Sequence, residues 1–129
     1  MTVTGHLDEP IQRALARPHT IDITTTGRRT GLRRRIELVF HVIEGNVVLS
    51  GMPGRRDWYA NLLADPHFMF HLKGPVEADL PAVARPITEP DERRRVMRAV
   101  TRNWHAEDRL EIFMRRSPLV EVTFEAQAA

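Results

Sequence analysis

The stretch TTTGRRTGLRRR, residues 24–35, lies between two segments whose hydrophobicity alternates as it does in β-strands. It contains two glycines, Gly27 and Gly31, which tolerate the left-handed backbone angles that a tight turn demands. It also contains five arginines and no carboxylate. The sequence therefore predicts a β-hairpin whose turn carries a concentrated positive charge.

The segments on either side extend this hairpin into a mainly β protein. Alternating β-branched and apolar residues predict strands over residues 19–26, 35–43, 46–50, 67–72, 75–87 and 118–125. We expect helices, the last one capped by Thr88, over residues 7–17, 57–66 and 88–104. Because the strands follow one another as hairpins, the pattern favours an α+β chain built on a six-stranded antiparallel barrel with short flanking helices.

Length and composition limit what this barrel can be. A chain of 129 residues fits one domain over residues 1–129, with an N-terminal helical segment at 1–18 and a flexible tail at 126–129. The absence of cysteine excludes disulfides, thiolate metal sites and cysteine nucleophiles. No apolar run reaches the roughly 18 residues of a membrane span, and no leader pattern is present, so we expect a cytoplasmic protein.

The arginine-rich turn is the main candidate for chemistry. Exposed backbone N–H groups in such a turn form a concave anion site, and guanidinium groups match phosphate and carboxylate. Charge-assisted hydrogen bonds contribute about 1.5–3 kcal/mol each, so three of them approach the roughly 8 kcal/mol of micromolar binding. The alternative is a solvated loop whose arginines pair with surface acids, and charge alone leaves both interpretations open.

The other candidate sites have less support. His67 and His71 lie on an expected strand, where they would be about 13 Å apart, so we expect no metal site. Ser50 lacks histidine and aspartate partners in a recognisable order, which disfavours a hydrolase triad. Trp58 and Tyr59, together with Asn61, follow the segment SGMPGRRD, and at least one of the two aromatic residues is expected to anchor a short helix to the barrel.

Four segments taken together resemble the deazaflavin-dependent nitroreductase family, a branch of the split β-barrel flavin and deazaflavin oxidoreductases. They are TTTGRRTGLRRRIELVF, NVVLSG, DWYANLLADP and VEADLPAVARPITEPDERRR, in that order. The likeness extends from about residue 21 to about residue 123. It implies a split barrel that binds coenzyme F-420, a deazaflavin, and passes its hydride to a nitro compound, a quinone or another unsaturated acceptor.

The resemblance also implies roles for individual residues. The turn would hold the phosphate and carboxylate tail of the coenzyme through Arg28, Arg29, Thr30, Gly31 and Arg34. Ser50 and Gly51 would lie along the deazaflavin ring, Trp58 and Asn61 would border the same pocket, and Tyr59 would donate a proton or hydrogen bond to the acceptor. The chain departs from the family pattern at GMPG after Ser50, and it lacks a tyrosine-rich C-terminal segment.

Two other classes of function stay open at this stage. One is a split-barrel reductase that uses FMN, and the other is a non-enzymatic coenzyme carrier or an anion- or nucleic-acid-binding module. The net charge of +2, and the lack of aromatics interleaved with a basic surface, argue against nucleic acid. We expect a small-molecule acceptor and no stable membrane insertion, with a homodimer and peripheral membrane association left open.

Overall fold

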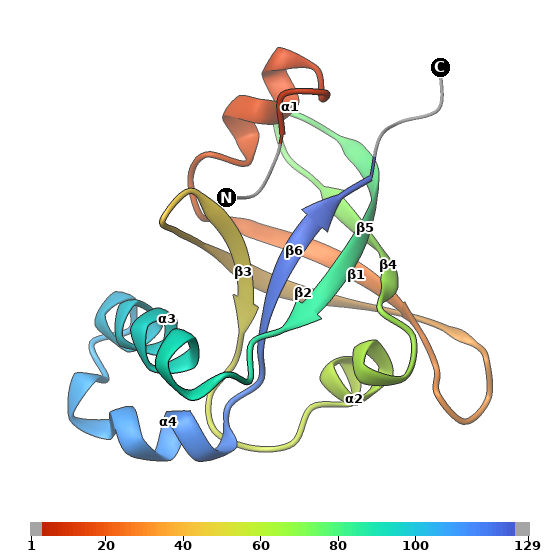
Figure 1. Ribbon diagram of the computed structural model, residues 1–129. Helices are drawn as coiled ribbons and strands as arrows, with labels where there is room; N and C mark the ends of the chain where they lie inside the picture. Colours follow the sequence, from red (N-terminus) through yellow and green to blue (C-terminus); the bar gives the residue numbers. More distant parts are fainter. Residues whose placement is uncertain (1–3, 126–129) are drawn as a thin grey trace.

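The computed structural model describes residues 4–125, which fold into a closed barrel of six antiparallel strands (Figure 1). The strands are β1 (Thr20–Thr26), β2 (Arg33–Ile43), β3 (Asn46–Ser50), β4 (His67–Leu72), β5 (Ala78–Pro86) and β6 (Leu119–Phe124). They are hydrogen-bonded in the order β1-β2-β3-β6-β5-β4, and β4 pairs back to β1. The predicted six-stranded antiparallel barrel is confirmed.

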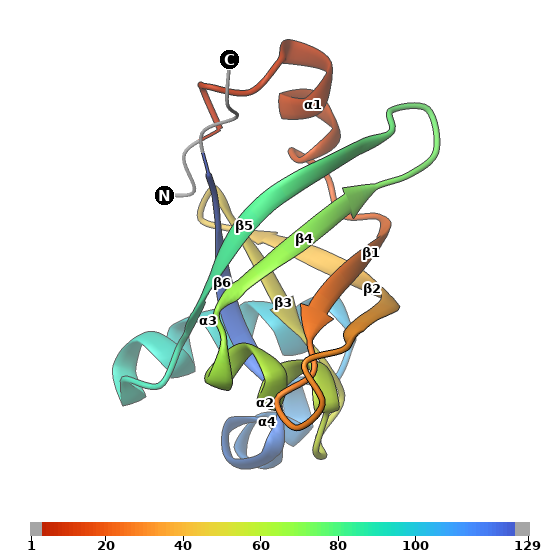
Figure 2. The same cartoon turned by 90° about the vertical axis from the view of Figure 1, so that its right-hand side faces the viewer.

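Within residues 4–125, four α-helices and one 3₁₀ turn lie outside the barrel. They are α1 (Glu9–Ala14), α2 (Asp57–Ala64), α3 (Pro90–Asn103), η1 (Glu107–Arg109) and α4 (Leu110–Arg116). Figure 2 shows α1 at one end of the barrel and α2, α3 and α4 at the other. The sequence did not predict α4 or η1. The predicted flexible tail at 126–129 lies outside the described residues, and the single domain over 1–129 stays a prediction.

The barrel interior is filled by side chains that alternate with outward-facing ones along each strand. Phe40, Phe70 and Phe124 form its aromatic centre. The ring centroids of Phe40 and Phe70 are 5.6 Å apart, and those of Phe70 and Phe124 are 5.1 Å apart. Each large apolar side chain buried in this way contributes about 1.5–3 kcal/mol. The barrel is therefore a packed core, and ligand cavities have to lie on its outside.

A second core lies between the barrel and the helices α3 and α4. Ile43, Val48 and Phe113 are buried there, so β2 and β3 bury side chains on both faces at this end. The same core encloses His41, whose Nδ1 is 3.1 Å from the Nδ2 of Asn103 and whose ring meets Trp104 edge-on. Burial lowers the pKa of His41 to about 4, which keeps the imidazole neutral.

The start of α3 differs from the expectation. Glu89, and not Thr88, caps the helix, because its carboxylate accepts the backbone N–H groups of Asp91 at 3.1 Å and Glu92 at 2.7 Å. Pro90 takes the first helical position, where its missing N–H is no loss and its ring disfavours a helical conformation at Glu89.

Candidate functional site

The turn between β1 and β2 is a compact loop that depends on its glycines. The N–H of Gly27 donates to the carbonyl of Leu32 at 2.7 Å, and the N–H of Gly31 donates to the carbonyl of Gly27 at 2.8 Å. Gly31 has a φ of +71°, in the left-handed region. A Cβ on Gly27 would lie 2.9 Å from the Oγ1 of Thr30 and 3.0 Å from the Leu32 carbonyl oxygen. The loop therefore has no room for a side chain at Gly27.

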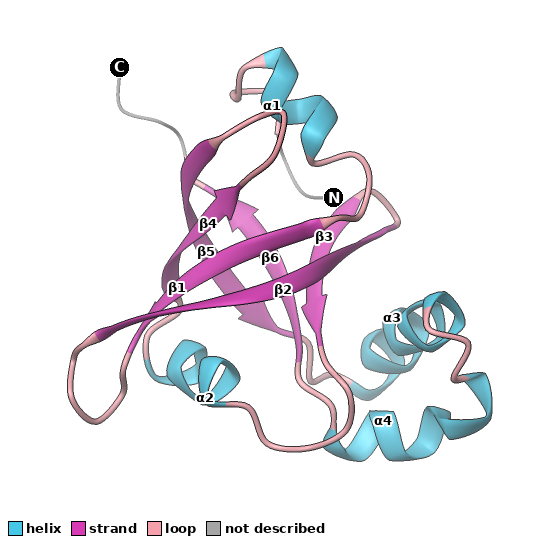
Figure 3. Ribbon diagram, turned by 180° about the vertical axis from the view of Figure 1, so that it is seen from behind, coloured by secondary structure: helices cyan, strands magenta, loops and turns pink. Residues whose placement is uncertain are grey.

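The buried side chain of Asn61 ties this loop to helix α2. Its Oδ1 accepts the backbone N–H of Arg28 at 3.1 Å and the Arg28 Nη1 at 2.9 Å. Its Nδ2 donates to the Oγ1 of Thr25 at 3.1 Å. Arg28 also reaches Asp57, the first residue of α2, at 3.3 Å. Figure 3 shows the result, in which the β1–β2 loop and α2 lie side by side at the same end of the barrel.

A cavity of about 440 Å³ opens between the loop and α2. Six of the predicted site residues line it: Arg28, Arg29, Thr30, Arg34, Trp58 and Asn61. Four further residues complete the lining, namely Thr25, Gly27, Ile36 and Asp57. Thr25 and Gly27 belong to the arginine-rich motif, whereas Ile36 is placed here by the β1–β2 register, in which it pairs with Ile23.

The donors in this cavity suit an anionic ligand. Among residues 4–125, neither the Arg29 nor the Arg34 side chain makes a hydrogen bond or an ion pair. Asp57 is the one carboxylate in the lining, and it already contacts Arg28. Trp58 and Ile36 supply an apolar wall. Two uncompensated guanidinium groups, next to a fixed third one, fit the phosphate and carboxylate groups of an acidic cofactor tail.

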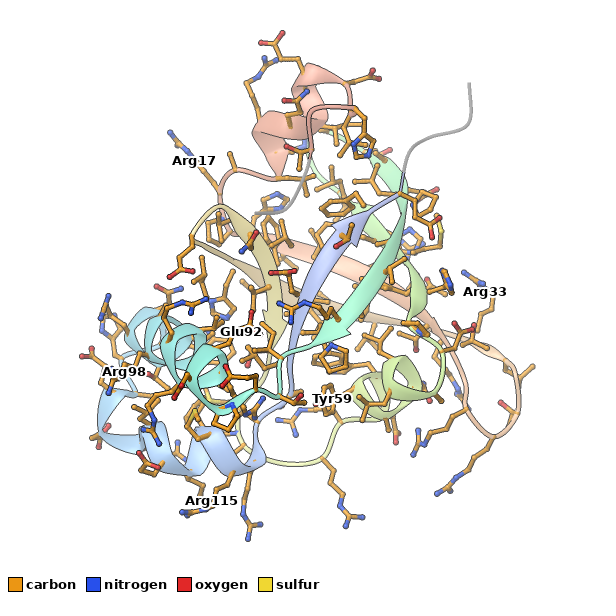
Figure 4. The ribbon with its side chains drawn as sticks, in the orientation of Figure 1. Arg17, Arg33, Tyr59, Glu92, Arg98 and Arg115 are labelled. Atoms are coloured by element: carbon orange, nitrogen blue, oxygen red, sulfur yellow. The ribbon has the colours of Figure 1, made fainter. Side chains whose placement is uncertain are left out.

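The remaining predicted site residues lie elsewhere. Gly31 shapes the turn without lining the cavity. Ser50, at the end of β3, is buried and donates its Oγ to the Pro118 carbonyl at 2.7 Å, and a Cβ on Gly51 would lie 3.3 Å from the ring of Pro118. Tyr59 lines a different cavity, on the side of α2 that faces α4 (Figure 4). Their roles toward the ring and the acceptor stay predictions.

The histidines of β4 take part in separate hydrogen bonds. His71 is buried, with its Nε2 2.7 Å from the Thr24 Oγ1 and its Nδ1 2.6 Å from the Asp79 Oδ1. His67 is exposed and lies 3.2 Å from Glu125. Within the described residues, no group of three or more side chains is arranged to hold a metal ion.

Comparison with known proteins identifies the family of this chain. The family model of F420H2-dependent quinone reductase matches residues 4–123. The chain belongs to this family. Members are F-420-dependent oxidoreductases, so the chain is an enzyme of that class with coenzyme F-420 as its cofactor. The resemblance inferred from the motifs, including its cofactor, is confirmed. No match was found among curated protein sequences.

Solved structures support the fold at low sequence identity. A conserved hypothetical protein of Mycobacterium tuberculosis is similar with a TM-score of 0.72 and 20% identity, over 92% of this chain and 81% of the other. An F420-H2 dependent reductase, FDR-A, has a TM-score of 0.60 and 21% identity, over 80% of this chain and 92% of the other. A structure described as a domain-swapped dimer has a TM-score of 0.58 and 22% identity, over 92% of this chain and 82% of the other. None of the helices described is long and apolar enough to cross a membrane.

Proposed function

We propose that this chain reduces a quinone, or a related unsaturated or nitro-containing acceptor, with reduced coenzyme F-420 whose acidic tail lies in the cavity beside the β1–β2 loop. The observation that carries the proposal is the pair of unpaired guanidinium groups, Arg29 and Arg34, in a cavity that the Asn61 amide holds in shape. The quinone as acceptor rests on the family name.

The protein's own contribution is to bind and orient. When bound, the coenzyme supplies the hydride that the acceptor takes up. Arg29 and Arg34 would neutralise the phosphate and carboxylates of the tail, while Arg28, fixed by Asn61, offers a third donor in one orientation. Trp58 would cover an apolar part of the coenzyme. Holding the reactants in one geometry is the main task left to the chain.

The role of Tyr59 as a hydrogen-bond donor to the acceptor depends on where the acceptor enters. Tyr59 and Trp58 are consecutive on α2, with ring centroids 6.1 Å apart, yet they line cavities on different sides of the helix. Within residues 4–125 the Tyr59 hydroxyl makes no hydrogen bond, so it is available to a ligand. This role requires an acceptor that approaches from the α4 side. Ser50 and Gly51, at the end of β3, would flank the ring from there.

The tail-binding assignment is tested by titration with the coenzyme and two arginine variants. Saturable quenching of coenzyme fluorescence is expected, and Arg34→Ala should weaken binding by about tenfold or more, because one charge-assisted contact is worth about 1.5–3 kcal/mol. Arg33→Ala removes the same charge from the neighbouring residue, which does not line the cavity, and should have a much smaller effect. Equal effects of the two variants, or no binding at high micromolar coenzyme, would contradict the proposal.

The alternatives predict different results in the same preparation. Tight FMN binding would give a yellow protein, whereas a coenzyme carrier would bind without turnover. A nucleic-acid-binding module would shift DNA in a salt-dependent way and show no reductase activity. Steady-state assays with quinones and nitroaromatics, using reduced coenzyme, rank the acceptors.

We also propose that the chain forms a homodimer, since a structurally similar protein is described as a domain-swapped dimer. Light scattering should then give about twice the 14.8 kDa of one chain. A cytoplasmic location and peripheral membrane association stay predictions, and cell fractionation tests both.

A further inference from the structure

A second cavity, of about 360 Å³, lies on the other side of α2, between the loop that follows β3 and the end of α4. Four arginines contribute to its walls together with Tyr59 and Ser117, and no carboxylate lines it. The arginines are Arg55, Arg93, Arg115 and Arg116. Figure 4 shows Tyr59 on α2 toward this side and Arg115 extending from α4.

Arg93 gives the cavity a fixed positive charge. Its half-buried guanidinium donates to the carbonyls of Ile87 at 3.0 Å, Met114 at 2.9 Å and Ser117 at 2.6 Å. Among residues 4–125 no carboxylate pairs with it. Burial lowers the pKa of Arg93, and Tyr59 is the neighbouring group that acts in the opposite direction. The carbonyls orient this cation without neutralising it, so it retains a full charge for an anion.

Three other arginines and one orphaned hydroxyl add to this charge. In the described part of the chain the side chains of Arg55, Arg115 and Arg116 make no ion pair. Ser117 is buried, and its Oγ has no hydrogen-bond partner among the described residues. A buried hydroxyl without a partner costs about 1–3 kcal/mol, and a ligand oxygen would recover this once a small shift of the cavity wall uncovers the Oγ. The Gly54 N–H donates to the Arg116 carbonyl at 3.0 Å, which joins the loop that follows β3 to the end of α4.

The arginines of α3 provide a useful contrast. Arg94 pairs with Glu111 of α4 at 2.6 Å, and Arg95 pairs with Glu44 at 3.0 Å in a groove that Asp91 also lines. Two acids, Glu44 and Asp91, therefore line this groove beside its four arginines. Among the described residues no acid lines the second cavity, although Arg115 lies close enough to Glu111 to help lower the pKa of that carboxyl, so a small anion is the simplest counter-charge for the lining arginines.

We propose that this second cavity is an anion site that binds the phosphate or carboxylate group of a small acidic ligand, separate from the site of the coenzyme tail. Arg115 and Arg116 supply exposed donors, Arg93 a fixed one, and the Ser117 hydroxyl a neutral one. The proposal concerns the side of α2 opposite the coenzyme tail, which is also the side from which the acceptor of the proposed function would reach Tyr59.

The test is an NMR titration of the full chain with inorganic phosphate. Saturable shifts are expected at the backbone amides of Gly54 and Ser117. The double variant Arg115→Gln/Arg116→Gln should lower phosphate affinity by about tenfold or more. Its matched control is Arg98→Gln/Arg102→Gln, which removes the same two charges from the α3 groove and should leave the affinity within about twofold.

Two further measurements keep the proposal falsifiable. Ser117→Ala changes no charge and should weaken phosphate binding by about threefold or more if the orphaned Oγ reaches the ligand. A titration with citrate distinguishes a carboxylate from a phosphate ligand, and saturation by either one supports the proposal. An equal loss of phosphate affinity in the control variant Arg98→Gln/Arg102→Gln would overturn the proposal. Amide shifts spread over every arginine-bearing surface would overturn it as well. Loss of phosphate binding in Arg34→Ala would also overturn it, because phosphate would then occupy the site of the coenzyme tail.

Discussion

Substitution of Asn61 should lower both the stability of the protein and its affinity for the coenzyme. Asn61→Ala removes three hydrogen bonds, two to Arg28 and one to Thr25, from a residue that is 3% exposed. At a net 0.5–1.5 kcal/mol each, with the Thr25 hydroxyl left unpaired in buried surroundings, we expect the free energy of unfolding to fall by about 2–4 kcal/mol. For a domain of this size that corresponds to a Tm lowered by about 8–16 °C.

The same substitution should release the β1–β2 loop from α2. Arg28 loses its fixed orientation, so coenzyme affinity should fall by about tenfold. Asn61→Asp separates the two effects. It keeps an oxygen for Arg28 but cannot donate to Thr25, and it adds a negative charge to the cavity, so we expect a smaller loss of Tm and a comparable loss of affinity.

Thermal unfolding followed by circular dichroism gives the Tm, and coenzyme fluorescence gives the affinity. The coenzyme titration is run at a temperature well below the Tm of both variants, so that weaker binding does not report unfolding. An Asn61→Ala variant with unchanged Tm and unchanged affinity would refute the reasoning, because the loop would then be held by other contacts.

The other predictions concern single residues of the loop and of the second core. Arg29→Ala should lower coenzyme affinity by about tenfold and make it less sensitive to salt. Gly27→Ala should cost about 1–3 kcal/mol of stability, since its Cβ would lie 2.9 Å from the Thr30 Oγ1, whereas Gly5→Ala meets nothing within 4 Å and is the control. Stability should fall by up to about 1.4 kcal/mol per pH unit from pH 6.5 toward 4, because unfolded His41 binds a proton that the folded form, with a pKa of about 4, does not. His41→Gln should flatten this profile.

Each of these expectations has a result that contradicts it. If the coenzyme affinity of Arg29→Ala has the same salt dependence as that of the unsubstituted protein, Arg29 does not contact the acidic tail. Equal stability of the two glycine variants would show that the turn can adjust. A pH profile that is the same with and without His41 would assign the acid sensitivity to other groups.

The barrel could be predicted from the sequence because its signals are local. Alternation along residues 35–43 and the glycines of the turn define the β1–β2 hairpin by themselves. Helix α4 and the 3₁₀ turn before it were missed, since they are short and their one fully buried side chain, Phe113, gives no periodic pattern. Tertiary packing under β2 and β3 decides their conformation.

The candidate site was predictable to a similar degree. The arginines of the loop and Asn61 occur in motifs, and the structure brings them to one cavity. The second cavity was not predictable, because it joins Arg93 to residues 115–117 through the packing of α3 on α4. No periodicity or spacing in the sequence relates such positions.

The place of β6 in the barrel has a consequence for biosynthesis. It is made after the other five strands of residues 4–125, yet it pairs with both β3 and β5 and closes the sheet between them. Until residues 119–124 leave the ribosome, two strand edges remain open in the nascent chain, and open edges recruit other chains. The yield of native enzyme in a cell should therefore depend on how well chaperones shield those edges until β6 has been made.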